Sequence, residues 1–317
     1  MQTLPADETP VVVPGRPAYR PFRVRVHRVE RLTPSFRQVT FTGPDLHELG
    51  QDGLDQRIKL LLPAGSGQLD DVGGPDWYDR WRGAPDGRRP ALRTYTVRRV
   101  RPRDRAVDVV LVDHESAHGE PGPAVRWLRA VEPGEEIILV GPDARSPDRH
   151  QGIDFRPGAA TRLLLAGDET AAPAIAGILE SLAGRPDVTV RAFVEVPDPA
   201  DRLPVDVPAT ARLHWLARGA GTHGDLLRPA VCAWLDGHAR LLDAVRAAGE
   251  QLLEDIDVDD ALLWESPDAS GETFYAWMAG EAAVVKSLRR AVVTDRGIDR
   301  RQVAFMGYWR RGQAERS

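Results

Sequence analysis

The chain has 317 residues, of which 42% are hydrophobic, and its formal net charge is −5. This length predicts two domains of roughly 150 residues each, and the acidic balance argues against a nonspecific nucleic-acid binder, which needs a basic surface. The single cysteine, Cys232, excludes an intramolecular disulfide and a cysteine-rich metal or iron–sulfur site, so no metal site is predicted.

The N-terminal region is rich in proline and polar residues, which predicts a flexible arm over residues 1–20. It lacks the cationic region followed by an apolar run that a secretory signal requires. No apolar run approaches the roughly 20 residues of a membrane-spanning helix. We therefore expect a cytoplasmic protein without membrane insertion.

Short segments that alternate polar and apolar residues follow the arm, as half-buried antiparallel strands do. The predicted strands cover residues 22–29, 36–43, 58–63, 91–100, 107–113 and 136–142. This series predicts an antiparallel β barrel, in a domain assigned to residues 21–150. Residues 64–90 predict a long loop, and its two tryptophans, Trp77 and Trp81, favour packing on the protein over a disordered insertion.

Strands and helices alternate in the second half of the chain, which predicts a parallel α/β sheet over residues 151–317. The predicted strands lie within residues 161–170 and at 188–196, 212–216, 274–281 and 302–309, with helices at 171–182 and 282–293. Two strands end in similar signals, Gly167-Asp168-Glu169 and Gly280-Glu281. Ligands bind beyond the carboxyl ends of such strands, although an acidic helix cap, worth about 1 kcal/mol, explains the same residues.

Two further motifs suit a flavin nucleotide. In the strand Arg93-Thr94-Tyr95-Thr96, alternation places the cation and the aromatic ring on one face, where they suit a pyrophosphate and an isoalloxazine ring. Ordinary cross-strand packing with a surface arginine is the alternative. Gly122-Pro123 precedes a short helix and leaves the amides of Ala124 and Val125 pointing outwards, as in a pyrophosphate seat. The nearby histidines, at 114 and 118, have no familiar metal-ligand spacing and are interpreted as polar loop residues.

Together and in this order, five blocks resemble the siderophore-interacting proteins, a branch of the ferredoxin-reductase-like flavoproteins. The blocks are residues 93–96, 113–127, 167–170, 277–281 and 307–310, and the resemblance extends over about residues 22–312. It implies a cytoplasmic NAD(P)H-dependent ferric-siderophore reductase, with an FAD-binding barrel and a C-terminal nicotinamide-binding α/β domain. No general acid or base is required of the protein, because FAD carries the electrons.

The resemblance also implies which residues hold the cofactors. Arg93 would contact the FAD phosphates, Tyr95 would pack on the isoalloxazine ring, and Thr96 would hydrogen-bond near its reactive nitrogen. The ribityl and pyrophosphate portions would be held by His114 and the turn 122–125. Asp168, Glu169 and Thr170 would face the nicotinamide nucleotide. The other cofactor residues in these blocks are Thr94, Asp113, Gly122, Pro123, Ala124, Val125 and Trp309. Trp309 would cover the flavin or the nicotinamide, with a core tryptophan anchoring the last strand as the alternative.

A ferric siderophore is commonly anionic, so the substrate site beside the flavin should contain cations. The candidates are Lys59, Arg145, Lys286 and Arg289. Lys286 and Arg289 lie three residues apart on one predicted helix, where an ordinary solvated surface explains Arg289 equally well.

Several alternatives remain open at the level of sequence. The segments 64–90 and 223–265, the latter predicted to be helical, are longer than a minimal member of the family requires. No arginine cluster follows Val194-Glu195, so neither NADH nor NADPH is preferred, and a ferredoxin donor is a further alternative. A flavin-dependent reductase with another acceptor and a noncatalytic siderophore binder also remain, although Arg93, Tyr95 and the Gly-Pro turn count against the latter.

Overall fold

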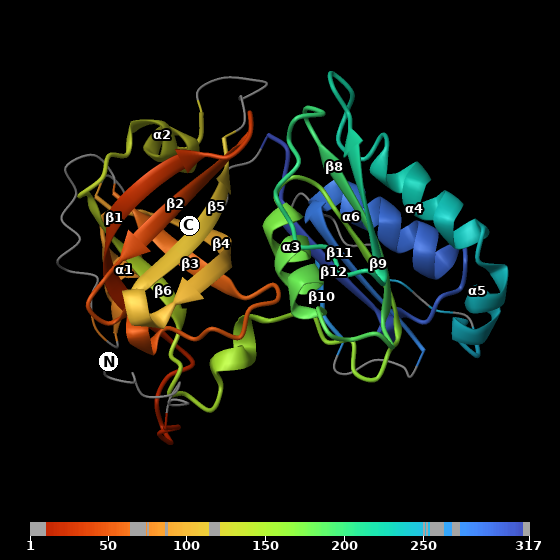
Figure 1. The fold of residues 1–317 in the computed structure, drawn as a ribbon, viewed down its shortest axis with the longest axis horizontal. Coiled ribbons are helices and arrows are strands. Elements are labelled where there is room, and N and C mark those ends of the chain that lie inside the picture. The colour runs from red at the N-terminus through yellow and green to blue at the C-terminus, as the bar shows by residue number, and fades with distance from the viewer. Residues whose placement is uncertain are drawn as a thin grey trace, which may run out of the picture.

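A computed structural model of the chain describes residues 11–63, 74, 76–85, 88–113, 121–249, 251, 253, 263–267 and 273–312. Figure 1 shows a β barrel formed by the N-terminal half beside a sheet flanked by helices formed by the C-terminal half. Among the described residues, no helix is long and apolar enough to cross a membrane.

The barrel is closed by six antiparallel strands in the order β1-β2-β5-β4-β3-β6. They are β1 (Tyr19–Arg31), β2 (Phe36–Thr42), β3 (Arg57–Leu62), β4 (Ala91–Arg101), β5 (Ala106–Val112) and β6 (Glu136–Pro142), as the alternating sequence pattern predicted. In β1, Phe22 and Val24 are buried inside the barrel while Arg23 and Arg25 are exposed. This alternation lets one strand face both the core and the solvent.

The segment 64–90 is not a loop throughout, because α1 (Trp77–Gly83) forms within it. Trp81 is 3% exposed and packs on the outer face of the barrel against Leu61, Leu92 and Val140. Its indole Nε1 donates a hydrogen bond to the carbonyl oxygen of Pro90, 2.9 Å away. The expectation that these tryptophans pack on the protein is confirmed, and the surface they cover is the outside of the barrel.

The second sheet has the strand order β10-β12-β11-β7-β8-β9. The strands are β7 (Arg162–Gly167), β8 (Thr189–Val196), β9 (Ala211–Ala217), β10 (Trp264–Glu265), β11 (Phe274–Glu281) and β12 (Val303–Trp309). All neighbouring pairs are parallel except β10, which pairs antiparallel with β12. The predicted parallel sheet therefore gains an antiparallel edge strand, and the segment 223–265 is not helical to its end.

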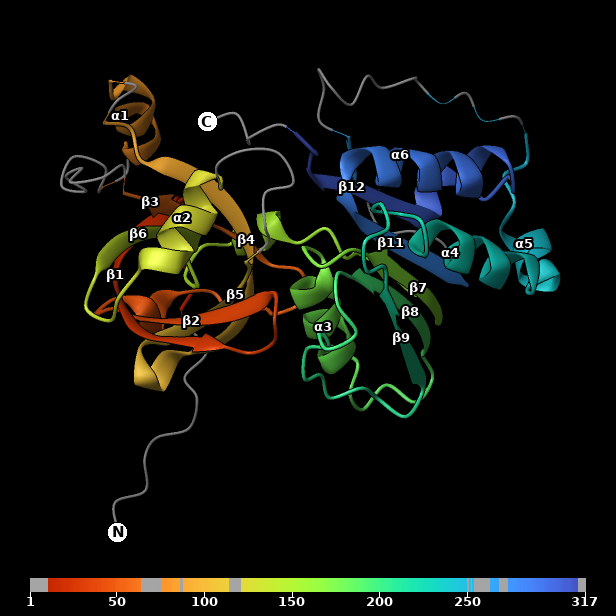
Figure 2. The same cartoon turned by 90° about the horizontal axis from the view of Figure 1, so that it is seen from above.

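Helices cover both faces of this sheet (Figure 2). α3 (Ala172–Ser181) packs on the face next to the barrel, whereas α4 (Leu227–Asp236), α5 (Ala239–Val245) and α6 (Ala282–Arg289) cover the other face. α6 continues as one π-helical stretch, Arg290–Thr294. In the barrel, α2 (Pro123–Ala130) follows the predicted Gly-Pro turn. Short 3-10 helices occur at Leu46–Glu48, Pro102–Asp104, Arg149–Gly152 and Arg300–Gln302.

Buried and part-buried polar contacts join the barrel to the sheet. Asp55, just before β3, accepts a hydrogen bond from the indole of Trp277 in β11 over 3.0 Å. Arg98 of β4 makes two 2.6 Å hydrogen bonds to Glu180 of α3. These contacts hold β4 beside α3, which begins directly after the Asp168 turn. The division of the chain into domains at residue 150 stays a proposal.

Candidate functional site

Six polar or aromatic side chains form a strand-end cluster at the carboxyl ends of β7, β9 and β12. Its members are Asp168, Glu169, Thr170, Arg218, His223 and Trp309. Three were predicted as nucleotide-facing residues from the turn after β7, and Trp309 was predicted from the last block. Arg218 and His223 were not predicted, because their link to Glu169 spans 49 and 54 residues of sequence.

Asp168 is the centre of this cluster and is buried. Its Oδ1 accepts hydrogen bonds from the amide and hydroxyl of Thr170, at 2.9 and 2.6 Å. Its Oδ2 accepts from the amide of Glu281 at 2.7 Å and from Nε1 of Trp309 at 2.9 Å. Burial and the neighbouring charge of Glu169 raise the pKa of Asp168 to about 6, against these hydrogen bonds, which lower it.

A side chain at either glycine of the two strand-end signals would clash with neighbouring atoms of the protein. A Cβ on Gly280, whose φ is +145°, would lie 2.7 Å from Oδ2 of Asp168, and one on Gly167 would lie 2.7 Å from the carbonyl oxygen of Ala279. The capping interpretation also holds at the second strand end, because the Glu281 carboxylate accepts from the amide of Val284 at the start of α6, 3.0 Å away.

The pKa of Glu169 is shifted in the opposite direction from that of Asp168, although the two residues are adjacent. Arg218 donates two 2.7 Å hydrogen bonds to its carboxylate, and Nε2 of His223 lies 3.1 Å from Oε1. Burial alone would raise the pKa of Glu169, but the hydrogen bonds and charges of His223 and Arg218 outweigh it and lower the pKa to about 2. Glu169 is therefore a carboxylate across the neutral range, and it holds a buried arginine.

Trp309 is half-buried and is not a core residue. Its ring meets His223 edge to face, with centroids 4.9 Å apart and planes at 76°. The hydrogen bond to Asp168 fixes the indole from its other side. The indole therefore lies where a nucleotide bound at the carboxyl ends of the strands would meet it.

The pairing of β3 with β4 confirms the predicted alternation in the Arg93–Thr96 block. Arg93 and Tyr95 pair with Leu60 and Ile58, which face the barrel interior, whereas Thr94 pairs with Lys59 on the outer face. Nζ of Lys59 donates to the hydroxyl of Thr94 over 3.1 Å. Thr96 is 7% exposed. One face of β4 thus carries Arg93 and Tyr95, and the other carries Thr94 beside Lys59 of β3, a predicted substrate cation.

The start of α2 has the geometry predicted for an anion seat. Gly122 is the N-cap residue with no side-chain capping bond, and Pro123 occupies the first turn. A Cβ on Gly122 would meet no atom within 4 Å among the described residues. The carboxylate of Asp113, by contrast, is held by Arg37 and Arg129, each at 2.7 Å, and anchors this helix. His114 lies outside the described residues.

The four predicted substrate cations are in different environments. Arg145 pairs with Glu48 over 2.7 Å. Lys286 is half-buried on α6, as is the Lys59 side chain on β3. Arg289 is only 5% exposed and makes a two-point contact with Glu265 of β10, at 3.0 and 2.5 Å. The solvated-surface interpretation of Arg289 is therefore wrong, because this side chain joins α6 to the edge strand.

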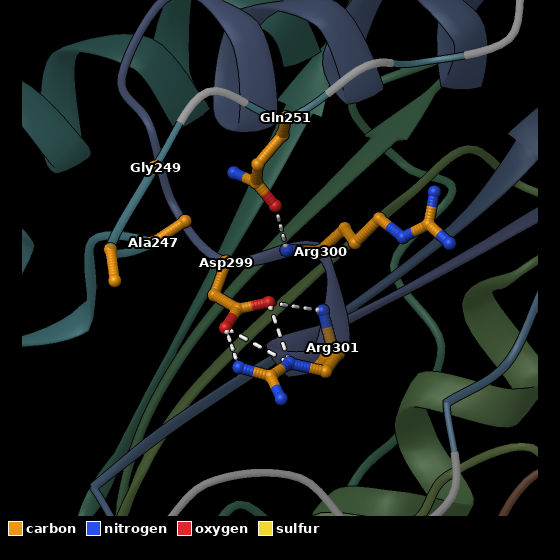
Figure 3. A pocket seen from close by; sticks show the side chains of 7 residues that line it. Ala247, Gly249, Gln251, Asp299, Arg300 and Arg301 are labelled. Carbon is orange, nitrogen blue, oxygen red and sulfur yellow. Dashed lines mark hydrogen bonds and ion pairs between the residues drawn. The ribbon is translucent and has the colours of Figure 1, made fainter.

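A separate hollow of about 310 Å³ lies at the opposite end of β12 from the strand-end cluster. Figure 3 shows Arg301 turned onto Asp299 and the Gln251 side chain accepting the amide of Arg300. Its lining residues are Ala247, Ala248, Gly249, Gln251, Asp299, Arg300 and Arg301. None of the predicted site residues lines it.

Comparison with known families agrees with the geometry of both halves. Residues 25–146 match the siderophore-interacting FAD-binding domain, and residues 160–312 match the siderophore-interacting protein family. The chain belongs to the siderophore-interacting protein family. An uncharacterized protein of Mycobacterium tuberculosis, Rv2895c, is 33% identical over 307 residues, which cover 95% of this chain and 93% of that protein.

The chain is also similar to a named reductase and to several proteins of solved structure. The ferric vibriobactin reductase ViuB of Vibrio cholerae is 26% identical, over 91% of this chain and 89% of its own. A siderophore utilization protein from T. fusca is 26% identical with a TM-score of 0.60, over 95% and 96% of the two chains. The siderophore-interacting protein SipS of Aeromonas hydrophila shares the fold, with a TM-score of 0.63 at 24% identity over 94% of each chain. A ferredoxin reductase of carbazole 1,9a-dioxygenase also shares it, with a TM-score of 0.56 at 16% identity over 94% of this chain and 71% of its own.

Proposed function

We propose that this protein is a cytoplasmic ferric-siderophore reductase that passes electrons from NAD(P)H through FAD to chelated Fe(III). The observation that carries the proposal is the placement of β4 beside α3, joined by Arg98 and Glu180. It brings the strand with the predicted flavin residues next to the helix that follows the Asp168 turn. Membership of the family and the likeness to a ferric vibriobactin reductase support the same activity.

The residues present fit FAD. Among the described residues, no atom fills the space beside Gly122 and no side chain caps the start of α2, which suits a pyrophosphate, since it prefers the free amides of a helix N-terminus. Arg93 and Tyr95 share one face of β4, where they would hold a phosphate and the isoalloxazine ring. When bound, FAD accepts a hydride from a reduced nicotinamide and delivers single electrons.

The strand-end cluster is the proposed nicotinamide site. Asp168 fixes Thr170 and Trp309 in place, so that the hydroxyl and the indole are held by the same carboxylate. Glu169 holds Arg218 at the edge of the same cluster. The half-buried indole would exclude water from one side of a bound nicotinamide.

The proposed substrate site lies between β3 and α6. Arg57, two residues before Lys59, places its guanidinium 4.3 Å from the ring centroid of Trp264 in β10. The next residue, Glu265, contacts Arg289 of α6, one helical turn after Lys286. β10 thus contacts β3, which carries Lys59, through Trp264, and α6, which carries Lys286, through Glu265.

Reduction releases the metal because Fe(II) binds hard oxygen donors more weakly than Fe(III) does. One reduced nicotinamide supplies two electrons, so it reduces two ferric complexes and releases one proton. The protein positions the nicotinamide, FAD and the ferric chelate next to one another, and its cationic side chains attract an anionic chelate.

An anaerobic titration tests the proposal. Purified protein loaded with FAD should lose its yellow colour with NADH, NADPH or a reduced ferredoxin, and a ferric siderophore should restore it. Lys59→Ala should raise the KM for an anionic chelate while flavin content stays unchanged, with Arg25→Ala on the exposed face of β1 as the control. A protein that refuses FAD would overturn the proposal, and a reduced flavin indifferent to ferric chelates would point to another acceptor.

A further inference from the structure

We propose that Asp55 is a positioning residue for hydride transfer, because it fixes the strand with the predicted flavin residues relative to the strand-end cluster. The inference rests on the proposed function, since it assigns a residue to the nicotinamide-dependent step of that reaction. In this step one hydride, a proton with the two electrons of its bond, leaves the reduced nicotinamide, which is oxidised, and reaches FAD, which is reduced. A displacement of about 1 Å between donor and acceptor lowers the rate of such a step by up to about a hundredfold.

The first step of the argument is the connection of Asp55 to the predicted flavin residues. Asp55 lies two residues before Arg57 of β3, which pairs with Thr96 of β4. The carbonyl oxygen of the next residue, Gln56, accepts a 2.9 Å hydrogen bond from the amide of Val97. The backbone beside Asp55 is therefore bonded directly to the strand that carries the Arg93–Thr96 block.

The second step is the connection of Asp55 to the sheet. Its Oδ2 accepts a hydrogen bond from Nε1 of Trp277 in β11 over 3.0 Å. Its carboxylate also accepts from the amides of Asp154 and Phe155, at 3.1 Å each, in the segment that leads to β7. Phe155 belongs to the apolar cluster that packs α3 on the sheet. Asp55 is 1% exposed, so water does not compete for these bonds.

β11 extends this connection to the strand-end cluster. Three residues after Trp277, Gly280 lies so close to the Asp168 carboxylate that a Cβ there would be 2.7 Å from Oδ2. The next amide, that of Glu281, donates to the same oxygen over 2.7 Å. One strand therefore joins the indole held by Asp55 to the carboxylate at the centre of the proposed nicotinamide site.

The residue before Asp55 is held in an unfavourable backbone conformation. Leu54 has a φ of +58°, in the left-handed region that residues other than glycine rarely adopt. Such a conformation persists only where the surroundings fix it. The Leu54 side chain packs against the apolar cluster of the sheet, and its carbonyl oxygen would lie 2.6 Å from a Cβ on Gly177 of α3. Two adjacent residues of the barrel thus contact β11 and α3, with no room for a side chain at Gly177.

The other polar contacts between barrel and sheet are less suited to this task. The side chains of Arg98 and Glu180 are 13% and 22% exposed, and both are long enough to follow a small shift of α3. Asp201 accepts from the hydroxyl of Ser35 over 2.7 Å, but the turn between β1 and β2 carries none of the predicted cofactor residues. Asp55 alone among these residues combines a short side chain with a direct backbone connection to β4.

Anaerobic stopped-flow reduction of the FAD-loaded protein by NADH or NADPH tests the inference. Asp55→Asn replaces one acceptor oxygen by a donor NH2 group, so the indole and the two amides are no longer all satisfied. Trp277→Phe removes the same connection from β11, and Gly177→Ala pushes α3 away from Leu54. We expect each variant to lower the rate constant of flavin reduction at saturating nucleotide about tenfold or more, with the Kd values of nucleotide and FAD changed less than about twofold.

Two further measurements separate positioning from other effects. Asp55→Asn/Trp277→Phe should be about as slow as the slower single variant, because both substitutions break one connection. Hydrogen exchange of the full chain needs neither FAD nor turnover. The amides of Asp154 and Phe155 should exchange faster in Asp55→Asn, while those of β2 and β5 keep their protection.

The matched controls are Asp108→Asn and Trp81→Phe, whose polar contacts lie within the barrel. Asp108 is 5% exposed and accepts from the hydroxyl of Thr40 over 2.7 Å, and the Trp81 indole donates to the carbonyl oxygen of Pro90. Both variants should reduce their flavin at the wild-type rate constant. Oxidation of the chemically reduced flavin by ferricyanide requires no nicotinamide, so it should keep the wild-type rate in every variant.

The outcomes distinguish the two proposals. Wild-type rate constants in Trp277→Phe and Gly177→Ala, or an equal loss in the two controls, would overturn the role of Asp55 even if Asp55→Asn does not fold. Slower reduction that is fully explained by weaker nucleotide binding would also overturn it. A wild-type flavin that neither nucleotide reduces would refute the nicotinamide-dependent reductase itself, whereas a wild type that is reduced as fast as its three variants would refute only the positioning role.

Discussion

The indole Nε1 of Trp309 donates a 2.9 Å hydrogen bond to Oδ2 of Asp168, which also accepts the amide of Glu281 at 2.7 Å. One carboxylate oxygen thus joins the ends of β7, β11 and β12. The indole in turn meets the His223 ring, which lies beside Glu169. Hydrogen bonds and one ring contact therefore connect the two neighbouring acids, Asp168 and Glu169, whose pKa values are shifted in opposite directions.

Trp309→Phe should move the titration of Asp168 to higher pH. Burial raises the pKa of Asp168 to about 6, and the hydrogen bond from Trp309 is one of the contributions that lower it, so its removal raises the pKa further. We expect the pH profile of anaerobic flavin reduction by NADH or NADPH to keep its shape while its acidic inflection moves to higher pH. Trp234→Phe on α4 is the control. An inflection that stays in place would mean that Asp168 does not titrate in this step.

Glu169→Gln should destabilise the fold, because it removes the charge of the carboxylate that accepts two hydrogen bonds from the buried Arg218. Arg218 is 7% exposed at its side chain, and breaking such a pair from one side costs about 3–5 kcal/mol. Because the folded pKa of Glu169 lies near 2, below its usual 4.5, its contribution is present above about pH 4.5 and is lost as the pH falls towards 2. Urea unfolding at neutral pH measures the effect.

The control for Glu169→Gln is Asp187→Asn, at an exposed pair with Arg185, and it should leave the urea midpoint unchanged. Equal effects of the two substitutions would show that the Glu169 pair behaves as an ordinary surface ion pair.

Gly122→Asp should separate stability from cofactor binding. No described residue lies within 4 Å of a Cβ at this position, and aspartate is a better N-cap residue than glycine, so the apoprotein should gain a few tenths of a kcal/mol. If the start of α2 is the pyrophosphate seat, the added charge should raise the Kd for FAD at least tenfold. Thermal unfolding and flavin titration measure the two effects. Unchanged FAD affinity would place the pyrophosphate elsewhere.

Much of the fold was predictable because its strands follow simple alternation or short apolar runs. All six barrel strands and the helix after Asp168 are examples. The two-residue strand β10 was not predictable, since Trp264 and Glu265 carry no periodic signal and owe their conformation to pairing with Met306 and Phe305. α1 was missed because a short helix among glycines and prolines resembles a loop.

The candidate site was predictable only where its residues lie in one segment. The turn after β7 and the block at 93–96 carry local signals. Arg218 and His223 reach Glu169 through the parallel order of the strands, which a single sequence does not reveal. The solvated-surface alternative for Arg289 was wrong for the same reason, because its partner Glu265 lies on a strand that the sequence did not indicate.

Asp55→Asn should alter the pH dependence of stability. Burial, followed by the charge of Asp154, raises the pKa of Asp55 from its usual 3.8 to about 6. Between about pH 4 and pH 6 the folded state thus binds more protons at this group than the unfolded state, so its contribution to stability falls as the pH rises through that window. The Asp55→Asn variant lacks this pH-dependent contribution to stability, because asparagine does not titrate. The stability of the wild type relative to Asp55→Asn should therefore be largest near pH 4 and decline by on the order of 2 kcal/mol by pH 7.

Trp277→Phe provides the matched variant for Asp55→Asn. It keeps the carboxylate but removes the indole that donates to Asp55 from β11, a hydrogen bond that lowers the pKa. The window of falling stability should then extend above pH 6. Urea unfolding midpoints of the wild type, Asp55→Asn and Trp277→Phe, measured from pH 4 to pH 8, test both expectations. A constant difference between the wild type and Asp55→Asn would mean that Asp55 is ionised throughout, and that the amides of Asp154 and Phe155 offset its burial completely.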